Sequence, residues 1–136
     1  MRKINLVAMA GQGKRFLDDG YKIPKPLIKI NGVPMFVHAA KALPKADLFI
    51  FICLKTHVVE FQINKQIKKF FPNSKIIILD KLTNGQAATC LMAEKFLKKD
   101  DILTIGACDN AMHYNRVRLN NKIDKSDLVI WTFKNN

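Results

Sequence analysis

The residues with the clearest chemical potential form a short glycine-containing segment, Ala10-Gly11-Gln12-Gly13-Lys14-Arg15, near the start of the sequence. The segment directly follows an apolar run at residues 4–9. Two glycines after a strand let the backbone approach a ligand and point successive N–H groups at it, as a phosphate site requires. The segment lacks the Gly-Lys-Ser/Thr ending of a P-loop, and Phe16 replaces the third glycine of a dinucleotide-binding fingerprint. It predicts a phosphate cradle, with an ordinary strand-to-helix turn as the alternative.

A second cation, Lys25, follows ten residues after Arg15 and stands between Pro24 and Pro26. Prolines favour an extended backbone, so we expect this lysine to lose little entropy when it is placed against a ligand. Arginine offers phosphate oxygens a planar fork of donors and lysine a compact charge, so the two residues could neutralise a triphosphate from two sides. We predict Arg15 and Lys25 as the catalytic residues. The alternative is a loop with solvated charges.

Asp109 is the predicted metal ligand. It follows the apolar run at residues 102–105 through Gly106, Ala107 and Cys108, where a carboxylate would face the same cleft as the glycine segment. Mg²⁺ prefers one or two carboxylates together with phosphate oxygens and water, which suits a site that cleaves a triphosphate. Mg²⁺ is therefore the predicted cofactor, and a turn or helix-capping aspartate is the alternative.

Gln86 follows a glycine turn at the start of a helical stretch, and its amide could recognise a base edge through a paired donor and acceptor. A capping or surface glutamine is the alternative. His38 and His57 are expected to be structural, and His113, four residues after Asp109, could line the cleft without an assigned role.

The elements that must position these residues alternate along the chain. Apolar runs rich in β-branched residues at 4–9, 48–53, 75–79 and 102–105 are typical of strands buried on both faces. A further strand is expected at 128–133. The alternation predicts one domain over residues 1–136, an α/β fold with a mostly parallel sheet, helices on both faces and ligands beyond the carboxyl ends of the strands.

Three helices are expected between the strands. One covers residues 35–43 after Pro34. A second is capped by Thr56, ends before Pro72 and carries one apolar face. The members of this face are Val59, Ile63, Ile67 and Phe70. The third helix has an apolar face made of Ala88, Leu91, Met92 and Phe96.

The composition narrows the class of protein. The formal net charge is +12, but the lysines are scattered, which favours a solvated basic surface over a polyanion partner. No apolar run approaches the length of a membrane-spanning helix, and we find no export signal. The three cysteines form no CxxC pair and are expected to be reduced thiols. We therefore expect a cytoplasmic protein with neither a nucleic-acid nor a membrane partner.

Four segments, taken in order, resemble the sugar nucleotidyltransferase family. They are Ala10-Gly11-Gln12-Gly13-Lys14-Arg15, Pro24-Lys25-Pro26-Leu27, Asn84-Gly85-Gln86-Ala87-Ala88 and Cys108-Asp109-Asn110. Residues 27–35 also resemble the strand, turn and helix that follow this lysine in the family. The resemblance extends from Ile4 to about His113 and agrees in order over that whole length.

The resemblance implies a glycosyltransferase-A-like nucleotide-binding fold. It implies that Ala10, Gly11, Gly13, Lys14, Arg15 and Lys25 bind the triphosphate, that Gly85 or Gln86 meets the base, and that Asp109 binds Mg²⁺. The implied partners are a nucleoside triphosphate and a sugar 1-phosphate or similar phosphorylated metabolite, whose phosphate oxygen attacks the α-phosphorus as pyrophosphate leaves. CTP is favoured slightly over dTTP or UTP, and precursors of capsule or surface polysaccharide are the expected products.

Some positions depart from the family pattern. Lys14 stands where Ser or Thr is usual, and Cys108 replaces a common glycine. Family members are generally longer, with the acceptor pocket and a second metal-binding aspartate further along the chain. The resemblance thus implies a truncated fold, the N-terminal nucleotide-binding part only. The alternatives are a nucleotide- or polyanion-binding module without turnover, and a structural or regulatory remnant that binds neither.

Overall fold

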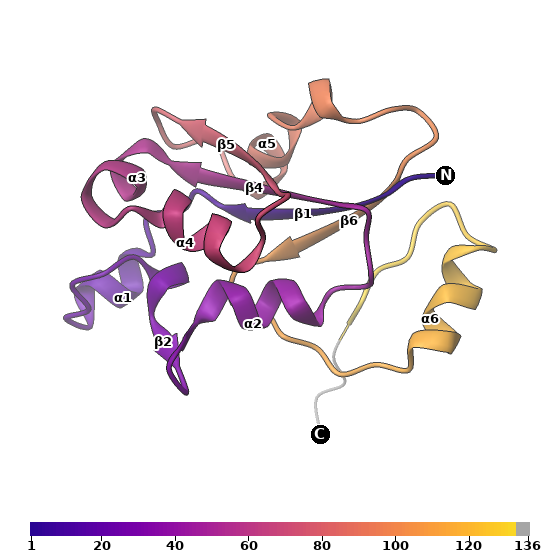
Figure 1. Cartoon of the computed structure of the whole chain (residues 1–136), viewed down its shortest axis with the longest axis horizontal. Helices are drawn as coiled ribbons and strands as arrows, with labels where there is room; N and C mark the ends of the chain where they lie inside the picture. The colour runs from indigo at the N-terminus through magenta and orange to yellow at the C-terminus, as the bar shows by residue number, and fades with distance from the viewer. Residues whose placement is uncertain (133–136) are drawn as a thin grey trace.

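The four apolar runs of the sequence form one parallel sheet in the computed structural model, which describes residues 1–132 (Figure 1). Its strands are β1 (Lys3–Met9), β4 (Leu48–Leu54), β5 (Lys75–Leu79) and β6 (Ile102–Ala107). They lie in the order β5-β4-β1-β6, and each neighbouring pair is parallel. The prediction of these four strands is confirmed.

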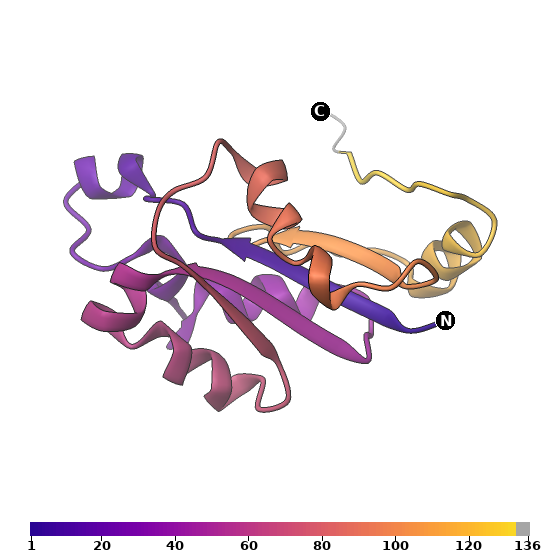
Figure 2. The ribbon, with the colours of Figure 1, turned by 90° about the horizontal axis from the view of Figure 1, so that it is seen from above.

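The two central strands, β1 and β4, are buried on both faces. In β1, Val7 and Met9 belong to one apolar cluster, whereas Ile4 and Leu6 belong to a second cluster on the opposite face. The first cluster is covered by α2 (Met35–Ala42) and α4 (Ile63–Phe70) and the second by the segment that contains α5 (Gln86–Leu91) and the 3-10 turn η2 (Glu94–Phe96). Figure 2 shows these helices on opposite sides of the sheet, so the predicted layering is confirmed.

The second predicted helix is divided in two. Helix α3 (Lys55–Phe61) ends and α4 begins at Gln62, whose φ is +52°. This left-handed residue resets the helical phase, so Val59 is 71% exposed while Ile63 and Ile67 are fully buried. The prediction of one shared face is therefore wrong at Val59. The predicted cap is also wrong, because Leu54 rather than Thr56 precedes the first turn.

The third predicted helix is likewise shorter than expected. Helix α5 ends at Leu91, and the separate turn η2 follows. Thr89 and Ala93 are buried, whereas Leu91 and Met92 are exposed, so the predicted apolar face is wrong at Leu91 and Met92. Phe96 packs against the core as predicted. The change from α-helix to a tighter turn alters which side chains face the sheet.

The smaller elements surround this framework. Helix α2 begins directly after Pro34, as predicted. The others are α1 (Lys14–Asp18), the 3-10 turn η1 (Lys25–Leu27), the hairpin strands β2 (Lys29–Ile30) and β3 (Val33–Pro34), and α6 (Arg116–Ile123). No helix within residues 1–132 has the length and apolar character needed to cross a membrane.

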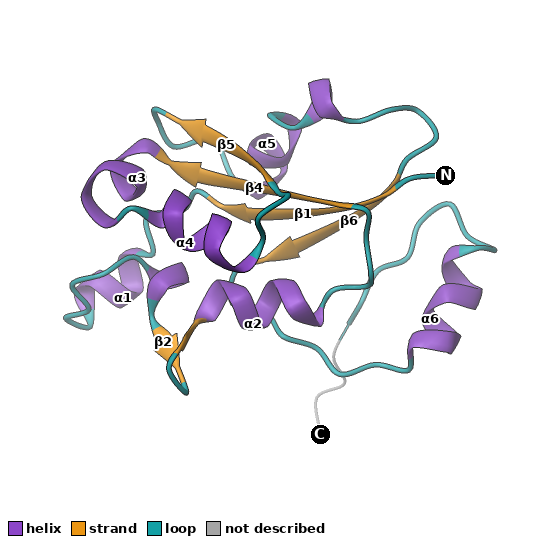
Figure 3. Ribbon diagram, viewed as in Figure 1, coloured by secondary structure: helices purple, strands orange, loops and turns teal. Residues whose placement is uncertain are grey.

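The strand expected at residues 128–133 is not formed. Residues 128–132 are a loop (Figure 3), and Phe133 lies outside the described residues. Leu128 and Ile130 are more than 70% exposed, whereas Trp131 is partly buried, with its ring centroid 6.4 Å from that of Tyr114. An apolar run becomes a strand only where it pairs with a sheet edge. This segment instead lines a cavity beside β6.

Candidate functional site

The glycine segment and Asp109 lie at the same edge of the sheet. Strands β1 and β6 are hydrogen-bonded neighbours, and their register pairs Ala8 with Ala107. Ala10 and Asp109 each follow that pair by two residues, so the two strands end side by side. The glycine segment and Asp109 therefore lie together beyond the carboxyl ends of two parallel strands. Ligand sites in open α/β sheets generally lie at this position.

Lys25 reaches across to Asp109. Its Nζ forms an ion pair with the Asp109 carboxylate and lies 5.2 Å from the centroid of the Phe16 ring. The side chains of Lys25 and Asp109 are 21% and 31% exposed, so both remain accessible from solvent. Three groups from separate parts of the chain thus converge at one point, and the packing of Lys25 against an aromatic face is a feature that sequence reasoning missed.

The backbone around Lys25 differs from its prediction. Pro24 is extended, but Lys25 begins the 3-10 turn η1, in which the amide of Leu27 donates to the carbonyl of Pro24 over 2.8 Å. Pro24 and Pro26 are both buried. The prolines therefore do restrict the lysine, by packing and by a tight turn rather than by an extended backbone.

Gly13 has a conformational role at the start of α1. Its φ of +63° is left-handed, and its carbonyl accepts hydrogen bonds from the amides of Phe16 and Leu17. A Cβ atom built at Gly13 would lie 3.3 Å from the Cβ of Lys25. Glycine thus permits both the turn and the close approach of the lysine. The side chains of Lys14 and Arg15 project from this first turn and are exposed.

Substituting Gly13 by alanine is expected to lower the free energy of unfolding by about 1–2 kcal/mol, because a left-handed conformation is costly for an L-residue. Gly11→Ala is the matched control, since Gly11 has no positive φ and its added Cβ would meet nothing within 4 Å. The control should leave stability unchanged or raise it slightly. Urea unfolding of the two variants measures the difference, and equal stabilities would contradict the role assigned to Gly13.

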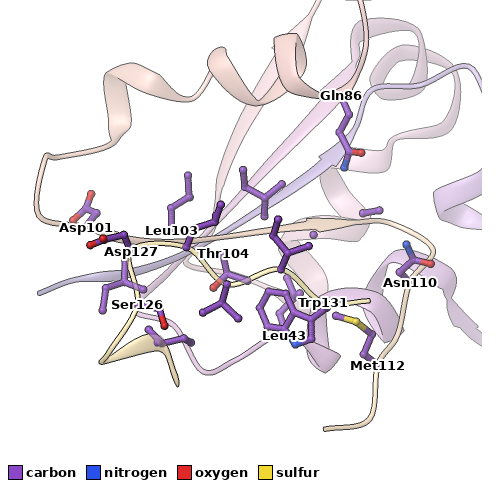
Figure 4. Close-up of a pocket in the computed structure, with 18 residues that line it drawn as sticks. Leu43, Gln86, Asp101, Leu103, Thr104, Asn110, Met112, Ser126, Asp127 and Trp131 are labelled. Atoms are coloured by element: carbon purple, nitrogen blue, oxygen red, sulfur yellow. The ribbon is translucent and has the colours of Figure 1, made fainter. Parts of the chain in front are cut away.

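Gln86, which follows Gly85 directly, lies across a cavity from the end of β6. This cavity has a volume of about 640 Å³, and its lining includes Gln86 together with Gly106, Ala107 and Asn110. Figure 4 shows Gln86 and Asn110 at one end of it and Asp101 at the other. Gln86 is exposed at the beginning of α5 and is therefore available to a ligand. Asn110 is a lining residue to which the sequence interpretation assigned no role.

The three histidines and Cys108 lie in different surroundings. His38 bonds to the carbonyl oxygen of Ile30 through Nε2 at 2.9 Å, and His57 is buried on α3, where burial lowers its pKa. His113 is exposed. The Cys108 thiol is buried directly before Asp109, and burial raises its pKa to about 11. It therefore stays protonated at neutral pH, unlike a reactive thiolate.

The donor set at Asp109 suits a metal that arrives with phosphates. Within residues 1–132, no group of three or more His, Cys, Asp or Glu side chains could enclose a metal ion. Asp109 supplies one accessible carboxylate next to the glycine segment and Lys25. Mg²⁺ is commonly held by one or two carboxylates with phosphate oxygens and water, so this arrangement fits a magnesium nucleotide better than a cage made only of protein.

Known proteins similar in sequence are named mannose-1-phosphate guanyltransferases. No protein-family model matches the chain. Two relatives, from Pichia angusta and Debaryomyces hansenii, are both named mannose-1-phosphate guanyltransferase and are 30% and 29% identical to it over 99 residues. The match includes 71% of this chain and 27% of each relative. The chain thus spans about a quarter of the length of these curated relatives.

Solved structures share the fold over a larger part of the chain. A nucleotidyl transferase from Methanothermobacter thermautotroptrophicus has a TM-score of 0.69 and 20% identity, covering 93% of this chain and 58% of that one. A nucleoside-diphosphate-sugar pyrophosphorylase from Vibrio cholerae has a TM-score of 0.65 and 21% identity, with coverages of 85% and 52%. An inositol-1-phosphate CTP transferase from T. maritima has a TM-score of 0.60 and 14% identity, with coverages of 77% and 43%.

These likenesses confirm the predicted fold class, and the chain covers about half of each solved structure. The likeness in sequence covers 71% of the chain and the likeness in structure up to 93% of it. The predicted resemblance to the sugar nucleotidyltransferase family is thus confirmed over part of the chain, in sequence by the mannose-1-phosphate guanyltransferases and in fold by the solved structures.

Proposed function

We propose that the chain supplies the nucleotide-binding part of a nucleotidyltransferase that moves a nucleoside monophosphate from a nucleoside triphosphate to a sugar 1-phosphate. The observation that carries this proposal is the convergence of Lys25 and Asp109 beside the glycine segment. The names of the curated relatives, mannose-1-phosphate guanyltransferases, support the class of acceptor. The proposal extends to a cytoplasmic enzyme whose product serves capsule or surface polysaccharide synthesis.

In the proposed reaction, the protein positions its substrates and neutralises charge. A phosphate oxygen of the acceptor attacks the α-phosphorus and forms a new P–O bond, while the bond from the α-phosphorus to the bridging oxygen breaks and pyrophosphate leaves. Backbone amides of the segment from Ala10 to Gly13 and the side chains of Lys14, Arg15 and Lys25 hold the triphosphate. Such reactions depend on orientation and electrostatic stabilisation, and they require no protein nucleophile.

Lys25 and Asp109 exchange partners when substrate binds. Without nucleotide, the lysine and the carboxylate satisfy each other in a partly exposed ion pair. A triphosphate would offer the lysine a higher negative charge, and Asp109 would then be free to hold Mg²⁺. When bound with the nucleotide, this ion would supply further neutralisation of the phosphate charge. Separating the two side chains when nucleotide binds would therefore require little free energy, since an exposed ion pair is worth only about 0–1 kcal/mol.

Calorimetric titration tests whether the chain holds a dedicated nucleotide site. With Mg²⁺ present, we expect one nucleoside triphosphate to bind at least about tenfold more tightly than inorganic tripolyphosphate, because base contacts add about 1.4 kcal/mol or more to the phosphate contacts. CTP is the nucleotide predicted from the sequence, and GTP, UTP and dTTP complete the series. Random DNA is the polyanion control.

The opposite result would identify the alternative function. A net charge of +12 can attract any polyanion. Equal affinity for CTP, GTP, tripolyphosphate and DNA, falling steeply with salt for each ligand, would contradict the proposal and favour a polyanion-binding module. Pyrophosphate release with a panel of sugar 1-phosphates then tests turnover.

A further inference from the structure

Two threonines hold the loop that leads into α5. The Oγ1 atoms of Thr83 and Thr89 lie 2.5 Å apart, and they lie 3.1 Å and 3.2 Å from the carbonyl oxygen of Gly85. The backbone amide of Thr89 donates to the same oxygen over 3.1 Å. Thr89 is 94% buried, since its exposed fraction is 6%. Each hydroxyl donates one proton, so two of the three hydroxyl contacts are hydrogen bonds at any time. Together with the Thr89 amide they connect Gly85 to both ends of its own loop, and we call this set of contacts the threonine clasp.

The clasp lies at a residue with an unusual backbone conformation. Gly85 has φ +102° and ψ 174°, a region that is essentially restricted to glycine and is held only where the surroundings determine it. A Cβ atom built at Gly85 would meet nothing within 4 Å, so the space on that side of the residue is open. The hydroxyl groups of Thr83 and Thr89, together with the backbone amide of Thr89, hold the Gly85 carbonyl in place.

The restrained residue directly precedes the ligand-facing glutamine. Gln86 is the first residue of α5 and lines the cavity that Asn110 also lines, at the end of β6 next to Asp109 (Figure 4). Rotation at Gly85 would move the Gln86 side chain and the Gly85 backbone together. Freedom at this position would therefore affect the two residues expected to meet the base and would leave the glycine segment and Lys25 in place.

We propose that Thr89, assisted by Thr83, is a positioning residue that fixes Gly85 and Gln86 for recognition of the nucleotide base. This inference rests on the proposed function. It assigns a role to two residues that touch no substrate themselves and act through the loop that they clasp. We expect removal of these hydroxyl groups to reduce selectivity for the base while phosphate binding is retained.

The test compares Thr89→Val with Thr89→Ser. Valine keeps the shape of threonine and removes the hydroxyl, whereas serine keeps the hydroxyl and removes a methyl group. We expect Thr89→Val to weaken binding of the preferred nucleoside triphosphate by about threefold to tenfold, the usual effect of one lost hydrogen bond. Binding of inorganic tripolyphosphate, which has no base, should remain unchanged. Thr89→Ser should restore most of the nucleotide affinity.

Two further variants make the result decisive. Thr83→Val removes the contacts of the less buried Thr83 hydroxyl with Gly85 and Thr89, and it should reproduce the selective loss if Thr89→Val folds poorly. Thr56→Val, on the exposed surface of α3, is the matched control and should bind as the unmodified chain does. Unchanged nucleotide affinity in both clasp variants, or equal losses for nucleotide and tripolyphosphate, would overturn the inference. Failure of the unmodified chain to prefer any nucleotide over tripolyphosphate would instead refute the proposed function.

Discussion

Asp109→Asn is expected to abolish the Mg²⁺ dependence of nucleotide binding and to reduce pyrophosphate release by at least about a hundredfold. Asparagine has nearly the same shape but offers the metal a neutral oxygen in place of a carboxylate. Metal ions contribute several kcal/mol of charge stabilisation in such reactions, and each 1.4 kcal/mol is a factor of ten in rate. Titration with and without Mg²⁺, together with a pyrophosphate assay, measures both effects.

The same substitution should leave the fold nearly intact. The Asp109 side chain is 31% exposed, and its ion pair with Lys25 belongs to the accessible class that is worth only about 0–1 kcal/mol. Asp80→Asn is the matched control, because Asp80 forms an exposed ion pair with Lys55 over 3.0 Å at the carboxyl end of β5. The control should bind nucleotide and Mg²⁺ normally.

Thermal melting separates a metal ligand from a structural cap. If Asp109→Asn melts much earlier than Asp80→Asn and its specific activity is normal, Asp109 is a capping residue and the proposed metal site is wrong. We expect the melting temperatures of the two variants to differ by only a few degrees, since 1 kcal/mol corresponds to a shift of that size in a domain of this length.

The sheet could be predicted from the sequence because its strands depend on local composition. Runs of β-branched residues without alternation are typical of strands covered on both faces, and β1 and β4 are buried in that way. The edge strands β5 and β6 depart from this expectation, because Ile78, Leu103 and Ile105 are exposed. Residues 128–132 have a similar composition, but a strand also needs a partner edge. That requirement is set by the rest of the fold, and no local pattern expresses it.

The helix boundaries were less predictable for a different reason. Val59 and Ile63 are four residues apart and fit one helical face, yet the positive φ of Gln62 separates them. Glutamine has no intrinsic preference for the left-handed region, so packing of α3 and α4 against the sheet must impose it. Gly85, by contrast, is a residue whose type already indicated an unusual turn.

The candidate site was predictable as a set of residues at one sheet edge, but its contacts were not. The rule that ligands bind beyond the carboxyl ends of parallel strands placed the glycine segment and Asp109 together. Lys25 and Asp109 are 84 residues apart in sequence, and their ion pair depends on the turn at η1 and the path of α1. The hydrogen bonds of Thr83 and Thr89 likewise depend on side-chain placement that spacing alone does not give.

Lys25→Met is the second substitution with a large expected effect. It preserves an unbranched side chain that can still cover the Phe16 ring, but it removes the charge that faces Asp109. We expect the affinity for the nucleoside triphosphate to fall about tenfold to a hundredfold, because a hydrogen bond to a charged group contributes about 1.5–3 kcal/mol. Calorimetric titration with magnesium nucleotide measures the loss, and tripolyphosphate should show a loss of similar size, because the lysine contacts phosphate and not the base.

Lys25→Arg distinguishes the role of charge from the role of shape. Arginine keeps the positive charge, but its wider planar group does not match the point between Phe16 and Asp109 that the compact lysine ammonium reaches. We therefore expect an intermediate loss of affinity.

Lys55→Met, which breaks the exposed pair with Asp80, is the control and should bind normally. If Lys25→Met binds triphosphate as tightly as this control, Lys25 is a structural partner of Asp109 alone. In a turnover assay, a raised KM with unchanged kcat would assign the lysine to ground-state binding, whereas equal falls in kcat and kcat/KM would assign it to the charge that develops as pyrophosphate leaves.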